Sequence, residues 1–173
     1  MRSNEPTFEQ AINATMLWTN AWEKGELSDE VLSDRIAQLL ASRDGARGFF
    51  VISLASDCPL MDRLPESLVL QLRTAGQVVI DLTVRNMAMS TAMAIHHQRQ
   101  GDAEQQAGSE RVIARSIDLL RLMEPTEVKK RLEKLLKATM KGEGDDVEFL
   151  NRWDYDEGQR LAIASSIYSV AEK

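Results

Sequence analysis

The stretch from Asn86 to Ile95 constrains the fold of this chain most, because it contains no charged residue. It mixes small side chains with flexible methionines, and it ends just before His96 and His97, the two histidines of the protein. A helix of this composition is apolar most of the way round, and such helices lie centrally in a bundle or in an oligomer interface. We therefore expect a helix at 77–99 that the rest of the fold, or a second copy of the chain, covers on most sides.

The segments on either side of this helix also carry helical patterns. Apolar residues recur every three or four positions, and capping residues or glycines stand where the patterns begin and end. The predicted helices follow Thr7, Ser28 and Asp156, run from Ser109 to Met123 and from Pro125 to about Lys141, and cover 147–153. The sequence thus predicts an all-α, single-domain bundle of six or seven helices around the helix at 77–99.

Two segments keep an α+β alternative open. Residues 49–54 and 78–84 are rich in apolar and β-branched side chains, which have high strand propensity. Periodicity alone does not distinguish a short buried strand from a piece of buried helix. If both segments were strands, the fold would contain a small sheet; if the second is helical, Gly76 is the place where that helix breaks.

The length of 173 residues suits one domain, which we expect to cover 1–173. Within it we expect a polar connection at 101–108 and an acidic link at 142–146, because glycines and polar residues interrupt the helical patterns there.

The single cysteine, Cys58, excludes an internal disulfide and is compatible with a reducing compartment. No apolar run follows the N-terminus, so we expect no secretory signal. The longest strongly apolar run, 49–55, is far too short to cross a bilayer. The sequence therefore predicts a cytoplasmic protein without a transmembrane segment.

The charge of the chain is uneven, and this bears on its partners. The net charge of −6 argues against nucleic-acid binding, which needs a basic surface for phosphate contacts. Residues 127–141 nevertheless carry a net charge of +4, between a segment at 1–44 with −4 and one at 142–173 with −5. A basic helix of this kind is either a solvated outer face or a surface for an acidic partner.

Several residues are candidates for contact with a protein partner or a second copy of the chain. The lysines of the helix at 127–141 fall away from its leucine stripe, two alanines one turn apart allow close helix approach, and one tryptophan is an interface anchor. These candidates are Lys129, Lys130, Lys134, Lys137, Ala88, Ala92 and Trp22. The residues expected in the core include Val128, Leu132, Leu135, Leu136 and Met140 of the basic helix, and Leu161, Ile167 and Tyr168 of the last helix.

A weaker set of candidates is Met89, Met93, His96 and His97, which line up at about one-turn intervals. Thioether and imidazole groups suit copper(I) or an axial haem contact. Adjacent histidines on a helix point about 100° apart, however, and the set has no thiolate. We therefore predict no metal and no cofactor, and a ligand- or metal/haem-binding protein using this face is the alternative.

Recognisable catalytic motifs are absent from the sequence. It has no phosphate-binding glycine loop, and the nearest histidine to Cys58 lies 38 residues further on. The sequence therefore favours a non-enzymatic interaction, assembly or regulatory module, with homo-oligomerisation expected. An enzyme whose site is assembled from scattered residues is the further alternative.

Overall fold

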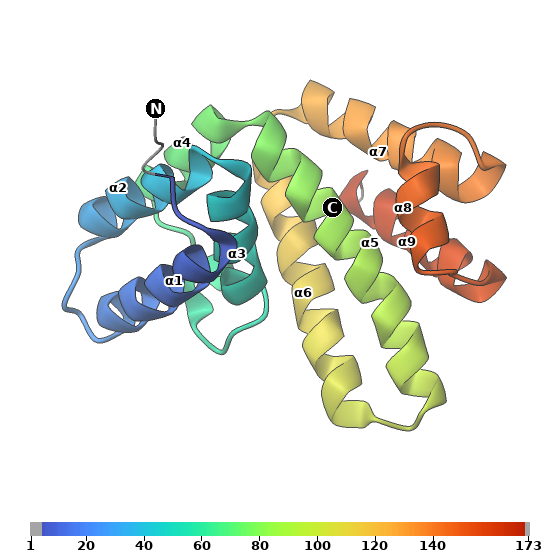
Figure 1. Ribbon diagram of the computed structural model, residues 1–173, viewed down its shortest axis with the longest axis horizontal. Coiled ribbons are helices and arrows are strands. Elements are labelled where there is room, and N and C mark those ends of the chain that lie inside the picture. The colour runs from blue at the N-terminus through green and yellow to red at the C-terminus, as the bar shows by residue number, and fades with distance from the viewer. Residues whose placement is uncertain (1–4, 172–173) are drawn as a thin grey trace. The chain divides into compact units, whose positions relative to one another are not determined.

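A computed structural model describes residues 5–171 of the chain (Figure 1). Over these residues it contains nine α-helices, one short 3-10 helix and no strand. The all-α prediction is therefore confirmed. The helix at 77–99 is also confirmed, since α5 spans Gln77–Arg99.

The α+β alternative is wrong. Residues 49–53 end α3 (Arg43–Ser53), and 78–84 lie inside α5. In α3, Ala46, Phe49, Phe50 and Ser53 recur at helical spacing and are all buried. Strand propensity measures how well a side chain fits a pleated, half-buried surface, and packing of these residues against neighbouring helices overrides it.

The number of helices exceeds the predicted six or seven for two local reasons. Residues 43–53 form a helix of their own, because the Ser42 hydroxyl accepts a hydrogen bond from the Gly45 amide and caps it. The predicted break at Gly76 also occurs, since this glycine has a φ of 54° and separates α4 (Glu66–Ala75) from α5.

The chain groups into two compact units, which we call the N-terminal unit, up to Leu82, and the C-terminal unit, from Thr83 onward. Helix α5 contributes to both. This grouping describes packing within the chain, and a single domain over 1–173 stays a prediction.

The first three helices of the N-terminal unit begin at hydroxyl caps. Thr7 and Gln10 form the expected capping box, and the Ser28 hydroxyl accepts from the Val31 amide. Besides α3, α4 and the start of α5, the elements are α1 (Phe8–Glu23), α2 (Asp29–Leu40) and η1 (Pro59–Asp62). Helix α1 packs on α3, and α2 packs on both α3 and α4.

The contact between α1 and α3 requires a glycine. A Cβ atom added to Gly48 would lie 2.5 Å from the Cβ of Ala11 and 2.7 Å from the carbonyl oxygen of Phe8. The two helices therefore approach closely enough that their small residues and backbones meet. Phe49 and Phe50, which follow Gly48, are fully buried and stack edge to face at 4.9 Å.

The C-terminal unit contains the rest of α5, α6 (Ala103–Leu122), α7 (Pro125–Lys141), α8 (Asp146–Arg152) and α9 (Glu157–Ala171). Figure 1 shows α6 running back along α5 after a tight turn. The predicted polar connection at 101–108 is wrong, because α6 begins at Ala103 and Ser109 lies within it. The Asp102 carboxylate accepts from the Gln105 amide and caps the helix seven residues before Ser109 could do so. Residues 142–145 join α7 to α8, and Asp146, the last residue of the predicted acidic link at 142–146, is the first residue of α8.

Within the C-terminal unit, α9 covers part of α5. The hydroxyls of Thr91 and Ser166 share a hydrogen bond of 2.8 Å, and the Gln159 side chain donates to the Ala92 carbonyl. Asp156 and Gln159 form the capping pair predicted for α9, and Asp156 also pairs with Arg99 of α5 at 2.6 Å. Polar contacts from α9 thus hold α5 at Thr91 and Ala92, within the apolar stretch, and at Arg99 beyond it.

By length and composition, α5 is also the one helix in residues 5–171 that could cross a bilayer. Of its most apolar window, 56% is buried inside the protein, as in a core helix.

Candidate interaction surface on α7 and α9

Helix α7 is defined sharply at both ends. Pro125 occupies its first turn, and the Glu124 carboxylate accepts hydrogen bonds from the amides of Glu127 (2.9 Å) and Thr126 (3.2 Å). Both hydrogen bonds lower the pKa of Glu124, because they stabilise its ionised form, and the bond from the Glu127 amide has the larger effect. At the other end, Gly142 has a φ of 67°, the left-handed conformation that commonly ends a helix. The predicted helix from Pro125 to about Lys141 is confirmed.

A buried ion pair fixes α7 to the start of α8. The Arg131 guanidinium donates to both carboxylate oxygens of Asp146, at 2.6 and 2.9 Å. The side chain of Asp146 is 1% exposed and that of Arg131 is 10% exposed. Two parallel bonds of this length hold the helices in a defined orientation.

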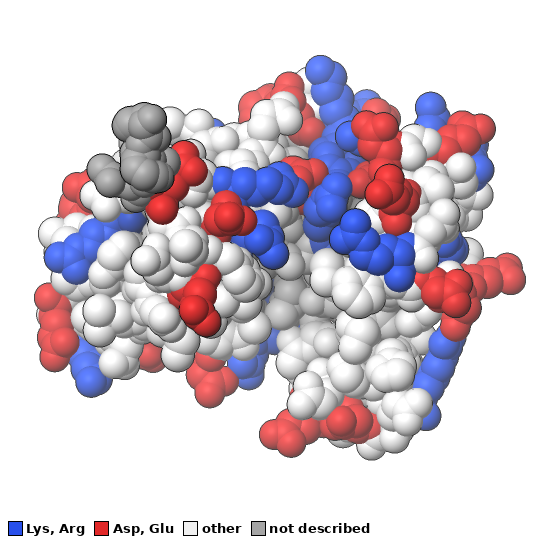
Figure 2. Space-filling model, in the orientation of Figure 1, with Lys and Arg blue, Asp and Glu red and all other residues white. Residues whose placement is uncertain are grey.

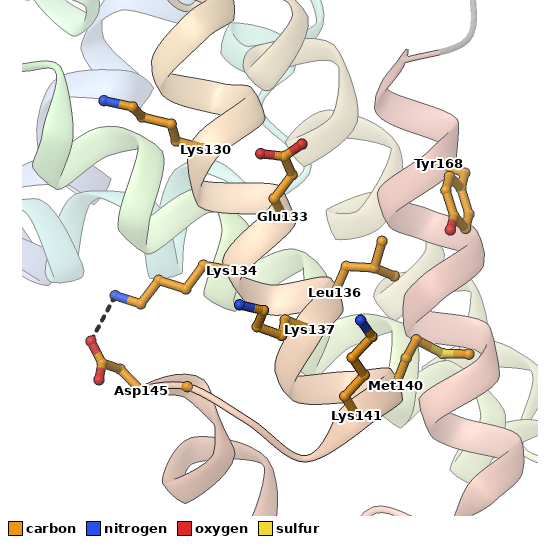
Figure 3. Close-up of a pocket in the computed structure, with 10 residues that line it drawn as sticks. Lys130, Glu133, Lys134, Leu136, Lys137, Met140, Lys141, Asp145 and Tyr168 are labelled. Carbon is orange, nitrogen blue, oxygen red and sulfur yellow. Dashed lines mark ion pairs between the residues drawn. The ribbon is translucent and has the colours of Figure 1, made fainter.

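The lysines of α7 form a stripe on its outer side. Lys130, Lys134, Lys137 and Lys141 are separated by four, three and four residues, so they share one face of the helix. Lys134 pairs with Asp145 of the acidic link at 3.1 Å, as Figure 3 shows. Lys137 and Lys141 have no ion-pair partner within residues 5–171. We call these four residues the lysine stripe.

Beside the lysine stripe lies an exposed apolar edge, formed by Leu136, Met140 and Tyr168. Met140 is 55% exposed, Tyr168 of α9 is 59% exposed, and Leu136 is half-buried. In Figure 3 the Met140 side chain points toward α9, and Lys134 points the opposite way, toward Asp145. The apolar edge and the lysine stripe together line a cavity of about 800 Å³.

A second cavity, of about 620 Å³, continues from the first along α7 and α9. The two share Glu133, Leu136 and Tyr168. The second cavity is mainly apolar, and its lining includes Leu120, Met123, Pro125, Val128, Leu132, Ile167 and Val170, with Arg121 and Lys129 among them. In Figure 2, Lys and Arg side chains gather, among some acidic ones, over the region where Figure 1 shows α7.

Three residues of this surface were expected in the core. Leu136 and Met140 extend the predicted stripe of α7, and Tyr168 was expected on the buried face of α9, yet Met140 and Tyr168 are more than half exposed. At 100° per residue, Leu136 and Met140 lie about 80° and 120° from Val128, at the edge of the stripe that α8 and α9 cover. The predicted apolar stripe is wide, and this width was the signal in the sequence that some of its side chains would remain exposed.

The structure brings together the lysine candidates but not the other interaction candidates. Lys130, Lys134 and Lys137 line the first cavity, and Lys129 lines the second. Ala88 and Ala92 are fully buried on α5, while Trp22 belongs to the N-terminal unit and donates its indole N–H to Asp29 at 2.8 Å. An interface role for these three residues stays a prediction.

The Met and His candidates lie on the last turns of α5. Met93 is 40% exposed and His96 is exposed, whereas Met89 and His97 are half-buried. The two imidazole rings meet edge to face with centroids 5.5 Å apart. In the part of the chain that the structure describes, no three His, Cys, Asp or Glu residues cluster in a way that could hold a metal.

Comparison with known proteins places the chain in a family without assigning it a role. Residues 7–170 match the family described as Uncharacterised conserved protein UCP020893, and the chain belongs to this family. No curated protein matches the chain, and no solved structure matches it.

Proposed function

We propose that this protein is a non-enzymatic interaction module of the cytoplasm that binds an acidic surface of a partner protein through α7 and α9. The observation that carries the proposal is the apolar edge of Leu136, Met140 and Tyr168 beside a lysine stripe in which Lys137 and Lys141 are unpaired among residues 5–171. An assembly or regulatory role follows from binding of this kind, without any reaction.

The apolar edge and the lysine stripe both cost free energy while they are exposed to water, and a bound partner can lower that cost. Exposed apolar area costs about 25 cal/mol per Å² relative to burial, and methionine and tyrosine are enriched in protein interfaces. The lysines repel one another, since they share one face within a few turns. An acidic partner with apolar side chains would relieve both costs at once.

The local charge decides where such a partner binds. The chain as a whole carries −6, so an acidic protein is repelled by most of it and attracted to the stripe on α7. Charges at the rim of an interface chiefly raise the association rate and reject wrong partners, while the apolar contacts slow dissociation. The apolar edge and the lysine stripe therefore have separable roles.

Affinity capture from the native cells tests this proposal when three forms of the protein are compared. The wild type and a Lys24→Glu variant are expected to retain the same acidic protein, and a Lys137→Glu variant, which makes the same charge change on the lysine stripe, is expected to lose most of it. Lys24 is an exposed lysine at the end of α1, outside both cavities, so it controls for the charge change. The retained protein, once purified, should bind less tightly as salt is raised. Retention of the same proteins by all three forms would contradict the proposal, and so would a nucleic acid as the species lost.

A further inference from the structure

The two cavities of the C-terminal unit form one continuous groove, and its dimensions describe what it can hold. They share Glu133, Leu136 and Tyr168, so the groove extends along α7 from the Pro125 end to the Lys141 end. Helix α7 has 17 residues and is therefore about 25 Å long. This length matches about four to five turns of a second helix lying alongside it.

The fold limits the backbone conformation that a bound segment can have. An extended peptide gains affinity by adding a strand to an open sheet edge, but residues 5–171 contain no strand. The amides and carbonyls of α7 and α9 are bonded within their own helices, apart from the ends. A segment lying in an apolar groove must then satisfy its own backbone hydrogen bonds, and an α-helix does so.

The chemistry of the groove is asymmetric across its width. At 100° per residue, Leu136 and Met140 lie about 80° and 120° round α7 from Val128, whereas the lysine stripe lies about 180° to 240° round. Toward the Lys141 end, apolar side chains therefore form the floor toward α9 and ammonium groups form one wall, with the Glu133 carboxylate between them at about 140°. Toward the Pro125 end, Lys129 lies at about 100°, among the apolar residues. A fitting helix carries an apolar ridge with carboxylates along one flank of it.

We infer that the groove along α7 and α9 binds an amphipathic α-helix of a partner protein, with an apolar ridge over Leu136, Met140 and Tyr168 and an acidic flank against the lysine stripe. This inference rests on the proposed function and specifies the partner of the same surface. It corresponds to the helix-in-groove mode of recognition, in which apolar residues at i, i+3, i+4 and i+7 act as anchors.

Three synthetic peptides of equal length, about five turns if helical, separate this inference from the proposed function. The first places leucines at i, i+3, i+4 and i+7 with glutamates on one flank. The second has the same composition, but its leucines and glutamates alternate, so no helical face gathers the leucines. The third is oligoglutamate. Binding to the whole protein is followed by fluorescence anisotropy of labelled peptides.

The expected result is that the first peptide binds at least about tenfold more tightly than the second and third. Equal binding of the first and second would overturn the helical partner and leave an acidic partner standing. No binding of any peptide would overturn the helical partner, and the capture experiment would then decide the proposed function by itself. Vesicles containing phosphatidylglycerol serve as a fourth probe. Binding to these vesicles and to none of the peptides would overturn the helical partner in favour of a lipid surface.

Two matched variants locate the site for the first peptide. Met140→Ser is expected to weaken binding about tenfold. Leu161→Ser is expected to leave it unchanged, because Leu161 is equally exposed on α9, at 54% against 55%, but lines neither cavity. Circular dichroism of both variants checks that the helices remain. Equal affinities of the two variants would place the peptide elsewhere and overturn the inference.

Discussion

The α1–α3 contact of the N-terminal unit and the α7–α9 contact of the C-terminal unit treat their apolar residues differently. In the first, Gly48 lets two helices approach until backbone meets side chain, and Phe49 and Phe50 are left with no exposed area. In the second, large side chains of both helices, Met140 and Tyr168, stay more than half exposed. The side chains that fill the first contact are completely covered, whereas the second contact leaves apolar area free for a partner.

The two units also anchor their helices by different chemistry. Hydroxyl groups of Thr7, Ser28 and Ser42 cap α1, α2 and α3 of the N-terminal unit. Carboxylates of Asp102, Glu124 and Asp156 accept from the first amides of α6, α7 and α9, and the Arg131–Asp146 pair holds α7 to α8. The open surface thus lies on a unit in which three helices begin at carboxylate caps, and the closed contact lies in a unit in which three helices begin at hydroxyl caps.

The largest expected effect comes from breaking the buried ion pair. Arg131→Leu should lower the free energy of unfolding by about 3–5 kcal/mol, because it leaves the Asp146 carboxylate buried without its partner. Urea denaturation measures the change. Lys134→Leu, which removes a lysine from the exposed pair with Asp145, should cost about 1 kcal/mol or less. Similar losses for the two variants would mean that charge does not hold α7 in place.

Overfilling the α1–α3 contact should have the next largest effect. Gly48→Ala places a Cβ atom against Ala11 and the Phe8 carbonyl, and overpacking of this kind costs about 1–3 kcal/mol. Gly108→Ala is the control, since Gly108 lies in α6 with no atom within 4 Å of its added Cβ. There alanine should stabilise the protein by about 0.5–1 kcal/mol, because glycine weakens a helix interior. Opposite signs for the two substitutions in urea denaturation would confirm the close approach of α1 and α3, and equal signs would contradict it.

Acid should loosen the helix starts of the C-terminal unit before those of the N-terminal unit. Hydrogen bonds from the amides of Glu127 and Thr126 lower the pKa of Glu124. The hydrogen bond between Asp156 and Arg99 lowers the pKa of Asp156. A carboxyl group whose pKa is lower in the folded than in the unfolded protein stabilises the fold at pH values above the unfolded pKa of about 4. This stabilisation is lost as the pH falls through the folded pKa. Amide exchange below about pH 4 should therefore rise in the first turns of α7 and α9. The first turns of α1 and α2, capped by hydroxyls, should not show this rise, and Glu124→Gln should remove it from α7.

The parts of this fold that the sequence predicts are those set by neighbouring residues. The caps at Thr7, Ser28 and Asp156, the break at Gly76 and the bounds of α5 and α7 all depend on residues a few positions apart. The start of α6 was misjudged because two caps compete locally, and Asp102 comes first.

The parts that the sequence does not predict depend on distant segments. Nothing near Gly48 in the sequence indicates that Ala11 will lie against it, because the two residues belong to different helices. Likewise, the lysine stripe can be predicted from α7 alone, but the exposure of Met140 on α7 and of Tyr168 on α9 depends on how the two helices pack. Periodicity identifies which residues share a face, and only the packing decides how much of that face is covered.

The smallest expected effect concerns the carboxylate that already occupies part of the open surface. Asp145 lines the same cavity as the lysine stripe and pairs with Lys134, although its side chain is 87% exposed. A bound acidic helix must compete with it, and an exposed pair is worth at most about 1 kcal/mol, or about fivefold in affinity. Asp145→Asn should therefore tighten binding of the amphipathic acidic peptide by about two- to fivefold. Glu143→Gln makes the same charge change on the same link but lines neither cavity, so it should tighten binding less. Equal gains from both variants would show that Asp145 acts only through net charge and does not compete with the peptide for Lys134.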